Sequence, residues 1–162
     1  MRDSFHDDLD GIGVSLIEMG QLVSKAMQRA TTALLTADLK IAEEIISEDD
    51  AIDAMQHDIE ARAINLMARQ QPVAGDLRTL VTSLRMSADL ERMGDLAHHV
   101  AKLTRMRYPA SAVPPELVLT LQEMGNITNR ITDKAISVIE SRNLEAALQL
   151  EKDDDEMDIL HR

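Results

Sequence analysis

The sequence predicts an all-α fold made of tandem three-helix bundles, of which the second is incomplete. The chain of 162 residues holds only six Gly and four Pro, too few for a turn-rich β fold. Aromatic residues make up 1% of it, so Leu, Ile, Ala and ten Met must fill the core, which suits helix-on-helix packing. Apolar residues also recur every three or four positions, the period of amphipathic helices.

The first predicted helix covers residues 4–36. Its apolar positions alternate steps of three and four, which is the spacing of a heptad seam. They are Leu9, Ile12, Leu16, Met19, Val23, Ala26, Ala30 and Ala33. Asp38 follows as a candidate N-cap for the next helix.

The second and third helices are predicted over 38–71 and 73–107, separated by the break at Pro72. Apolar residues of the second repeat every seven positions: Ile45, Ile52, Ile59 and Leu66. Those of the third are Leu77, Leu80, Leu84, Leu90, Ala97, Val100 and Leu103. Because short connections make neighbouring helices antiparallel, residues 1–108 should form an up-down-up bundle.

After a proline-rich linker at 109–115, the segment 116–162 repeats the start of the chain. Shifted by 105 residues and without a gap, residues 15–53 match 120–158 at ten of 39 positions. The shared motifs are "EMG", at 18–20 and 123–125, and "DDxxD", at 49–53 and 154–158. Such a match indicates an internal duplication.

The second repeat ends within its second helix, so we expect a chain truncated relative to a complete duplication. Its hairpin presents an apolar seam of Leu117, Leu121, Met124, Ile131, Ala135 and Val138 that Leu144 and Leu148 cannot cover alone. We expect two copies of the hairpin to pair as a four-helix bundle around a two-fold axis. Alternatively, the hairpin folds back on the first bundle or is disordered.

Two acidic pairs are the candidate functional residues. Residues four apart share a helix face, so Asp49 with Asp53 and Glu91 with Asp95 each point one way. Both pairs are centred 21 residues from Pro72, which puts them level in an antiparallel hairpin. Four carboxylates meeting there would repel one another unless a hard cation such as Mg, Mn, Ca or Fe bound them. Asp154 and Asp158 repeat the first pair.

A solvated acidic face is the alternative, because other acidic pairs have the same spacing: Asp3/Asp7, Glu44/Glu48 and Glu151/Asp155. His98 and His99 follow Asp95 closely enough to reach the site, although a surface or interface role suits them better. Gly94, between the acids, allows either a close approach at the site or simple helix packing.

The net charge of −12 argues against binding to nucleic acid or anionic lipid and favours cations or a basic protein surface. The chain has no cysteine, no Glu-x-x-His pair, no phosphate-binding glycine loop and no G-x-S-x-G motif, so we expect no enzyme. No apolar run approaches the length of a membrane span, and the acidic N-terminus is not a signal peptide. We expect a cytoplasmic protein.

Five stretches together resemble the PhoU family of phosphate-transport accessory and regulatory proteins: "FHDDLD" at 5–10, "EMG" at 18–20, "EDDAID" at 48–53, "QQPVAGDLR" at 70–78 and "DLERMGDLAHHVAK" at 89–102. The resemblance implies (E/D)xxxD motifs that bind multinuclear metal clusters. Their residues here would be Asp49, Asp53, Glu91, Asp95, Asp154 and Asp158. Leu96 departs from the family pattern, in which His is common there.

The resemblance further implies a negative regulator of phosphate uptake and of phosphate-starvation signalling. Such a protein would be a non-enzymatic adaptor between the phosphate ABC transporter's ATPase and a sensor histidine kinase. It would form a homodimer and carry metal ions, iron first and Mn, Mg or Zn as alternatives. A helical metal-storage or metal-dependent hydrolase-like protein is the competing interpretation.

Overall fold

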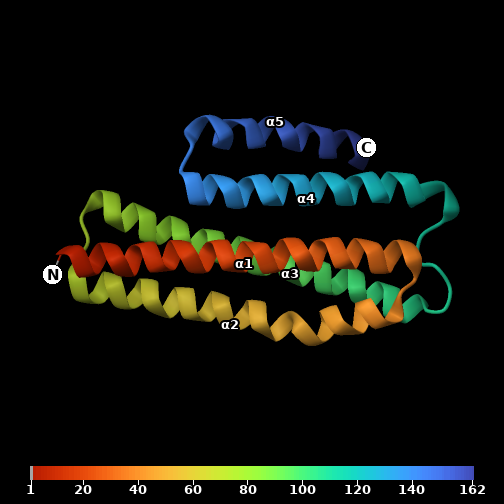
Figure 1. Ribbon diagram of the computed structural model, residues 1–162, viewed down its shortest axis with the longest axis horizontal. Helices are drawn as coiled ribbons and strands as arrows, with labels where there is room; N and C mark the ends of the chain where they lie inside the picture. The colour runs from red at the N-terminus through yellow and green to blue at the C-terminus, as the bar shows by residue number, and fades with distance from the viewer. Residues whose placement is uncertain (1) are drawn as a thin grey trace.

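The computed structural model consists of long helices whose axes run roughly along one direction (Figure 1). It describes residues 2–162, apart from the side chains of residues 2–4 and of Asp49. The helices are α1 (Arg2–Thr36), α2 (Leu39–Gln70), α3 (Ala74–Arg107), α4 (Val118–Ser141) and α5 (Leu144–His161), with a 3₁₀ turn η1 (Pro115–Leu117) before α4. The described residues form no strand, and the first three helices begin and end within two residues of the predicted ranges.

Helices α1, α2 and α3 pack on one another as the expected up-down-up bundle. Their shared core contains the predicted seam of α1, with Ile12, Met19 and Val23 fully buried. It also contains all four predicted positions of α2: Ile45, Ile52, Ile59 and Leu66. For α3 the prediction is partly wrong, because Leu77 and Leu103 are 41% and 46% exposed.

The buried side chains of the bundle are smaller toward the α1–α2 turn. There the buried residues are mostly alanines, namely Ala30, Ala33, Ala42, Ala97 and Ala101, whereas larger side chains such as Ile59 and Leu80 fill the opposite end. Small side chains allow helix axes to approach more closely. Phe5 is the one aromatic residue of these two clusters, and alanines and aliphatic side chains supply most of the rest.

The turns of the two hairpins have the same construction. Ala37, after α1, and Arg142, after α4, both adopt left-handed backbone conformations, with φ of 52° and 54°. Each is followed by a side-chain N-cap: Asp38 accepts a hydrogen bond from the Ile41 amide, and Asn143 accepts one from the Ala146 amide, both at 3.0 Å. All these residues are 105 positions apart, as the predicted duplication requires.

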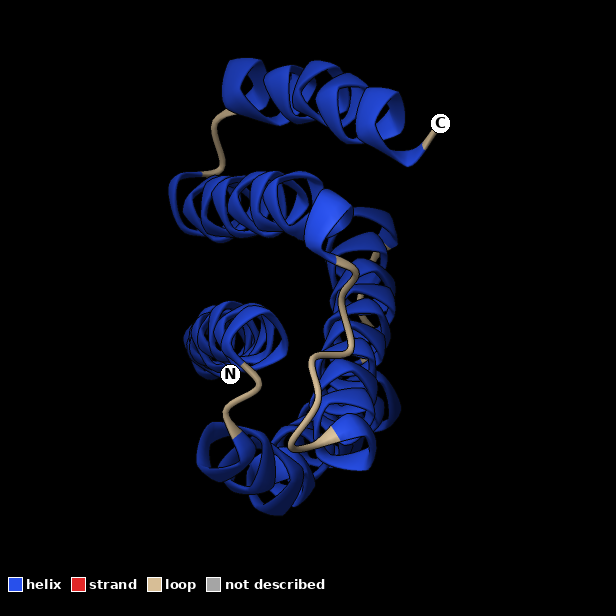
Figure 2. Cartoon of the chain, turned by 90° about the vertical axis from the view of Figure 1, so that its right-hand side faces the viewer, coloured by secondary structure: helices blue, strands red, loops and turns tan. Residues whose placement is uncertain are grey.

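Helix α4 folds back on the first bundle and lies against α1, as the end-on view shows (Figure 2). A Cβ at Gly20 would come within 2.8 Å of Ile136, and one at Gly125 within 2.5 Å of Thr31. Because 125 and 136 are the repeat equivalents of 20 and 31, these two contacts are related by a local two-fold axis between antiparallel helices. The interface also includes a hydrogen bond that Ser24 donates to Asp133, at 2.7 Å.

Helix α5 packs only on α4 among the described elements. Its Leu144, Leu148 and Ile159 are 74%, 60% and 69% exposed. The folding-back alternative therefore holds for α4, which α1 covers, while α5 keeps an open apolar face. Pairing of two hairpins through that face stays a prediction.

Candidate functional site: the facing flanks of α2 and α3

Gly94 on α3 lies against Ile52 on α2, at the level of the two acidic pairs. A Cβ on Gly94 would lie 3.0 Å from Cδ1 of Ile52, so glycine permits the close approach here. Ile52 lies between Asp49 and Asp53, and Gly94 lies between Glu91 and Asp95. The two acidic pairs are therefore level with each other, as their equal distance from Pro72 predicts.

The described carboxylates of this level are half-buried. They belong to Asp53 on α2 and to Glu91 and Asp95 on α3. The side chain of Asp49 lies outside the described part of the chain. Arg92 contacts Asp95 loosely, with 3.5 Å between Nη1 and Oδ2, and the Asp95 side chain is 35% exposed.

The histidines beyond Asp95 differ from each other. His99 is exposed, His98 is half-buried, and their ring centroids are 6.3 Å apart. On α2, Nδ1 of His57 lies 2.8 Å from the Asp53 backbone carbonyl, so that ring is turned toward its own helix. None of these three histidines is required as a metal ligand by its position near the two acidic pairs.

The sequence pattern did not predict a set of ion pairs between α1 and α2. Arg29 on α1 binds both Glu44 and Glu48, at 2.5 and 2.6 Å. Glu44 and Glu48 are thereby turned toward α1. Glu44 and Glu48, whose spacing also fitted a solvated face, thus take part in ion pairs between α1 and α2.

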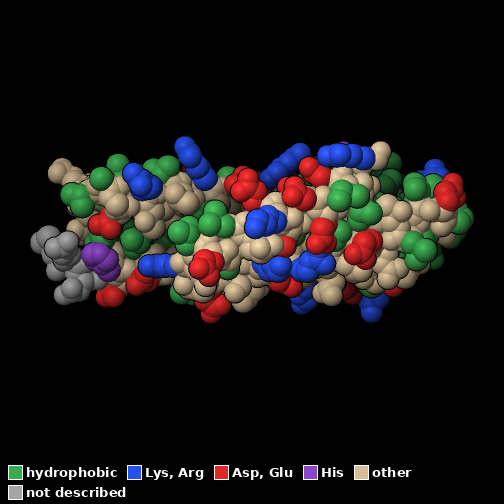
Figure 3. All heavy atoms as spheres, turned by 90° about the horizontal axis from the view of Figure 1, so that it is seen from above, with side chains coloured by type: hydrophobic (Ala, Val, Ile, Leu, Met, Phe, Trp, Pro, Cys, Tyr) green, Lys and Arg blue, Asp and Glu red, His purple; other side chains and the backbone are tan. Residues whose placement is uncertain are grey.

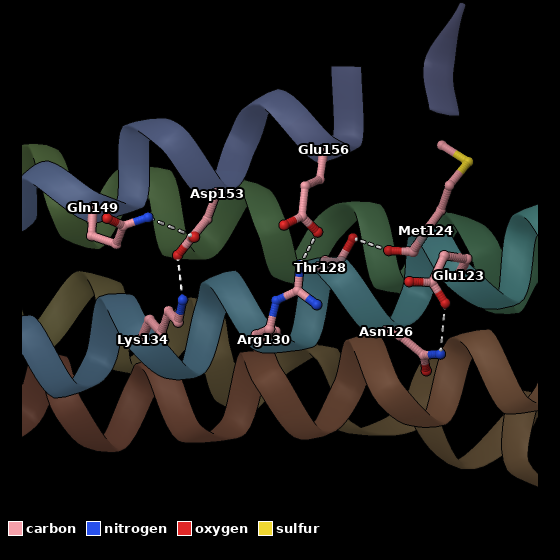
Figure 4. A network of polar contacts seen from close by, with 9 residues as sticks. All are labelled: Glu123, Met124, Asn126, Thr128, Arg130, Lys134, Gln149, Asp153 and Glu156. Atoms are coloured by element: carbon pink, nitrogen blue, oxygen red, sulfur yellow. Dashed lines mark hydrogen bonds and ion pairs between the residues drawn. The ribbon is translucent and has the colours of Figure 1, made fainter. Parts of the chain in front are cut away.

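The same arrangement occurs 105 residues later, between α4 and α5 (Figure 4). Lys134 binds Asp153 at 2.5 Å, and Gln149 donates a hydrogen bond to the same carboxylate at 3.3 Å. These two hydrogen bonds, with Lys134 the larger cause, hold the pKa of Asp153 below its ordinary value of 3.8. Arg130 and Glu156 form a second ion pair across the hairpin. Asp154 and Asp158, the third predicted metal-binding pair, are exposed on α5.

We call the sets Arg29/Glu44/Glu48 and Lys134/Gln149/Asp153 the first and second clamps. Each joins the two helices of its hairpin at equivalent positions. The repeats share a cation and a carboxylate here but no identical residue, because Arg29 aligns with Lys134 and Glu48 with Asp153, while Glu44 aligns with the neutral Gln149. A comparison of the repeats by charge would have found the clamps, whereas a count of identical residues does not.

The residues at the Ile52–Gly94 level suit a hard cation. All four predicted donors are carboxylates, and the glycine contact brings their helices close together. Among the described side chains, which exclude that of Asp49, no three His, Asp or Glu groups gather closely enough to hold a metal ion. The metal site at Asp49, Asp53, Glu91 and Asp95 therefore stays a prediction, as does a site at Asp154 and Asp158.

The sequence of this chain is similar to those of known proteins. Residues 16–104 match the PhoU domain. The phosphate-specific transport system accessory protein PhoU homolog 2 of Mycobacterium bovis is 44% identical over 162 residues, which cover 100% of this chain and 76% of that protein. The chain belongs to the PhoU family.

Other PhoU relatives are more distant in sequence but similar in structure. The PhoU homolog of Clostridium acetobutylicum is 35% identical over 99% of this chain and 73% of its own. The crystal structure of PhoU from Pseudomonas aeruginosa superposes with a TM-score of 0.89 at 28% identity, covering 96% of this chain and 74% of that one. For the phosphate transport system regulatory protein PhoU from Streptococcus pneumoniae the TM-score is 0.86 at 28% identity, over 96% and 72% of the two chains. The all-α helical-bundle fold is thus that of PhoU proteins.

Proposed function

We propose that this PhoU protein is a cytoplasmic negative regulator of phosphate uptake and phosphate-starvation signalling. Membership of the family supports the coarser role, because its relatives are accessory proteins of phosphate-specific transport. The finer role is that of an adaptor that binds the transporter ATPase and a sensor histidine kinase without catalysing a reaction. No described helix is both long and apolar enough to cross a bilayer.

The proposed adaptor carries metal at the Ile52–Gly94 level. Asp49, Asp53, Glu91 and Asp95 would hold a divalent or trivalent cation, with iron favoured by the family resemblance and Mn, Mg or Zn as alternatives. Carboxylates supply oxygen ligands only, which hard cations prefer, and those of Asp53, Glu91 and Asp95 are half-buried. The cation would neutralise acids at the level where Ile52 and Gly94 meet, and so would stabilise α3 against α2. Asp154 and Asp158 are proposed to contribute to a second site.

Removal of two central carboxylates tests the metal proposal. In the double variant Asp53→Asn/Asp95→Asn, the metal content of purified protein should fall severalfold by elemental analysis. The matched control is Asp50→Asn/Asp89→Asn, which removes one exposed carboxylate from each of the same two helices. Equal metal content in the two double variants would contradict the site. Chelation should also lower the melting temperature of the wild type more than that of Asp53→Asn/Asp95→Asn, because bare carboxylates repel one another.

The adaptor proposal needs a different measurement. The full chain should capture the phosphate transporter ATPase and the sensor histidine kinase in pull-downs, and chelation should weaken the capture. A metal-storage or hydrolase-like protein would instead load metal in excess of the site or consume a phosphoester in the presence of Mn or Fe. Turnover without capture would overturn the adaptor role.

A further inference from the structure

The solvent face of α3 carries a regular stripe that neither the bundle core nor the candidate metal site uses. Arg78, Arg85, Arg92 and His99 follow one another at intervals of seven residues, and all four are exposed. The residue two positions after each of them is buried: Leu80, Ser87, Gly94 and Ala101. Two residues turn a helix by about 200°, so the stripe lies opposite the buried face of α3.

Large apolar side chains lie along the same stripe. Val81, Leu96 and Leu103 are three or four residues from the nearest member of the series, and Met106 follows His99 by seven. The four are 36%, 45%, 46% and 78% exposed. Leu103 was expected in the core from its spacing. Single exposed apolar residues are ordinary, but four in line over about 38 Å of helix form a packing surface. We refer to these eight residues as the α3 stripe.

The charge of α3 differs in sign from that of the rest of the chain. Six of the 17 Lys and Arg residues lie in α3, but only four of the 29 Asp and Glu residues do. Its net charge is therefore +2, against −14 for the remainder. By contrast, the face formed by α4 and α5 shows acidic and basic side chains interspersed (Figure 3). The α3 stripe is a narrow basic and apolar ridge on an acidic protein.

We propose that the α3 stripe is a docking site for a helix of a partner protein that presents an acidic and apolar face. Apolar and basic residues are interleaved along one line of α3 at steps of three, four or seven residues, so a helix packed along this line would need apolar and acidic residues on its facing side. The stripe is one helix wide, which suits a helix. An anionic membrane would be repelled by the net charge of −14 on the rest of the chain. The inference rests on the proposed adaptor function for the partner's role, not for the binding itself.

The stripe also borders the candidate metal site. Arg92 belongs to the stripe and contacts Asp95, a predicted ligand. A docked acidic helix would compete with Asp95 for Arg92. Binding of a partner and binding of a cation to the neighbouring carboxylates are thus joined through one side chain.

A model peptide tests the stripe without knowledge of the natural partner. The probe is a labelled 28-residue amphipathic helix with Leu at a and d and Glu at e and g, titrated with the full chain in fluorescence anisotropy at about 0.15 M ionic strength. We expect saturable binding, at least about tenfold weaker for Arg78→Glu/Arg85→Glu because like charges then face each other. The matched control is Lys40→Glu/Arg69→Glu, with the same charge change at exposed positions of α2. It should bind like the wild type.

Further variants and probes distinguish the apolar from the charged contribution to peptide binding. Val81→Ser/Leu103→Ser should weaken peptide binding with no change of charge, and a peptide with Gln in place of Glu should bind more weakly than the Glu peptide. Equal affinity of the stripe variant and the α2 control would overturn the proposal. So would binding to vesicles with anionic lipid but not to the peptide. So would a wild-type dimer in light scattering that Arg78→Glu/Arg85→Glu makes monomeric, because a second copy would then occupy the stripe. If the chain captured the transporter ATPase or the kinase but did not bind the peptide, the adaptor function would stand and the proposal for the α3 stripe would be wrong.

Discussion

The two repeats place the same residues in different surroundings. Leu16 in α1 is 2% exposed and Met19 is fully buried, whereas Leu121 and Met124, their identical equivalents in α4, are only half-buried. The difference is larger still between Ile12, at 0%, and Leu117, at 46%. Helix α1 is surrounded by α2, α3 and α4, while α4 contacts α1, α5 and η1. Burial therefore depends on how many helices surround a seam, and not on the seam itself.

Interactions within each helical hairpin, in contrast, recur in both repeats. The left-handed turn residue, the N-cap and the clamp between the first two helices all recur 105 residues apart. Each needs only the two helices of its own hairpin. The duplication has thus preserved what a hairpin can make by itself, and the surroundings of each hairpin decide the rest.

The largest expected effect comes from breaking the seam in each repeat. Leu16→Ala should lower the free energy of unfolding by about 2–5 kcal/mol, because it leaves a cavity in a closed core. Leu121→Ala removes the same atoms from a half-buried site and should cost roughly half as much. Urea denaturation of the two variants measures the difference. Equal losses would show that another surface covers Leu121 in solution, as pairing of two hairpins would.

The second prediction concerns the two-fold contact between α1 and α4. Gly125→Ala should destabilise the protein by about 1–3 kcal/mol, because the new methyl would lie 2.5 Å from Cγ2 of Thr31. That threonine is held by a hydrogen bond to the Met27 carbonyl, so it cannot easily turn away. Gly20→Ala should cost less, since its new methyl would lie 2.8 Å from Cγ1 of Ile136, a less severe overlap than 2.5 Å.

Gly13→Ala is the matched control for this pair, because a Cβ there meets nothing within 4 Å. It should stabilise α1 by about 0.5–1 kcal/mol through helix propensity alone. Adding Thr31→Ser to Gly125→Ala should recover part of the loss, because it removes Cγ2. Thermal unfolding that shows Gly125→Ala as stable as Gly13→Ala would contradict the packing of α4 on α1.

A smaller effect is expected at the two N-caps. Asp38→Ala and Asn143→Ala each remove one hydrogen bond to a first-turn amide and should each cost about 1 kcal/mol. Because the bonds have the same length, 3.0 Å, the two losses should agree within error. Chemical denaturation of both variants checks this. Losses that differ by more than about twofold would show that the repeated turns are not energetically equivalent.

The smallest and most conditional effect is the pH dependence of the second clamp. Hydrogen bonds from Lys134 and Gln149 lower the pKa of Asp153, so its carboxylate stabilises the folded chain above the ordinary pKa of 3.8. That contribution is lost as the pH falls through the lowered value. The difference in melting temperature between wild type and Asp153→Asn should thus be constant near neutrality and shrink below pH 3.8.

Asp155→Asn, on the same helix but exposed, is the control for this last measurement. Its difference from the wild type should be small near neutrality, where that of Asp153→Asn is largest. If Asp153→Asn gave no difference near neutrality either, the clamp of the second repeat would contribute nothing to stability. The two clamps would then be alike in position only.

Much of the fold could be predicted from the sequence because its determinants are local. Apolar period, the N-cap at Asp38 and the break at Pro72 set the helices of the first bundle to within two residues. The level of the two acidic pairs followed from counting residues on either side of Pro72, and the Ile52–Gly94 contact confirms it. The 105-residue shift likewise indicated the duplication that the turns and clamps display.

What the tertiary structure decided depends on which helices face which. Leu103 has the spacing of a core residue but lies on the solvent face, because the pattern of α3 is apolar on two opposite sides and periodicity cannot rank them. Glu44 and Glu48 read as a solvated pair until Arg29, from another helix, is seen to bind both. The packing of α4 on α1 rests on glycines at 20 and 125, whose partners lie more than 90 residues away in the sequence. Contacts between distant segments depend on the relative rotation of whole helices, and no local pattern specifies that rotation.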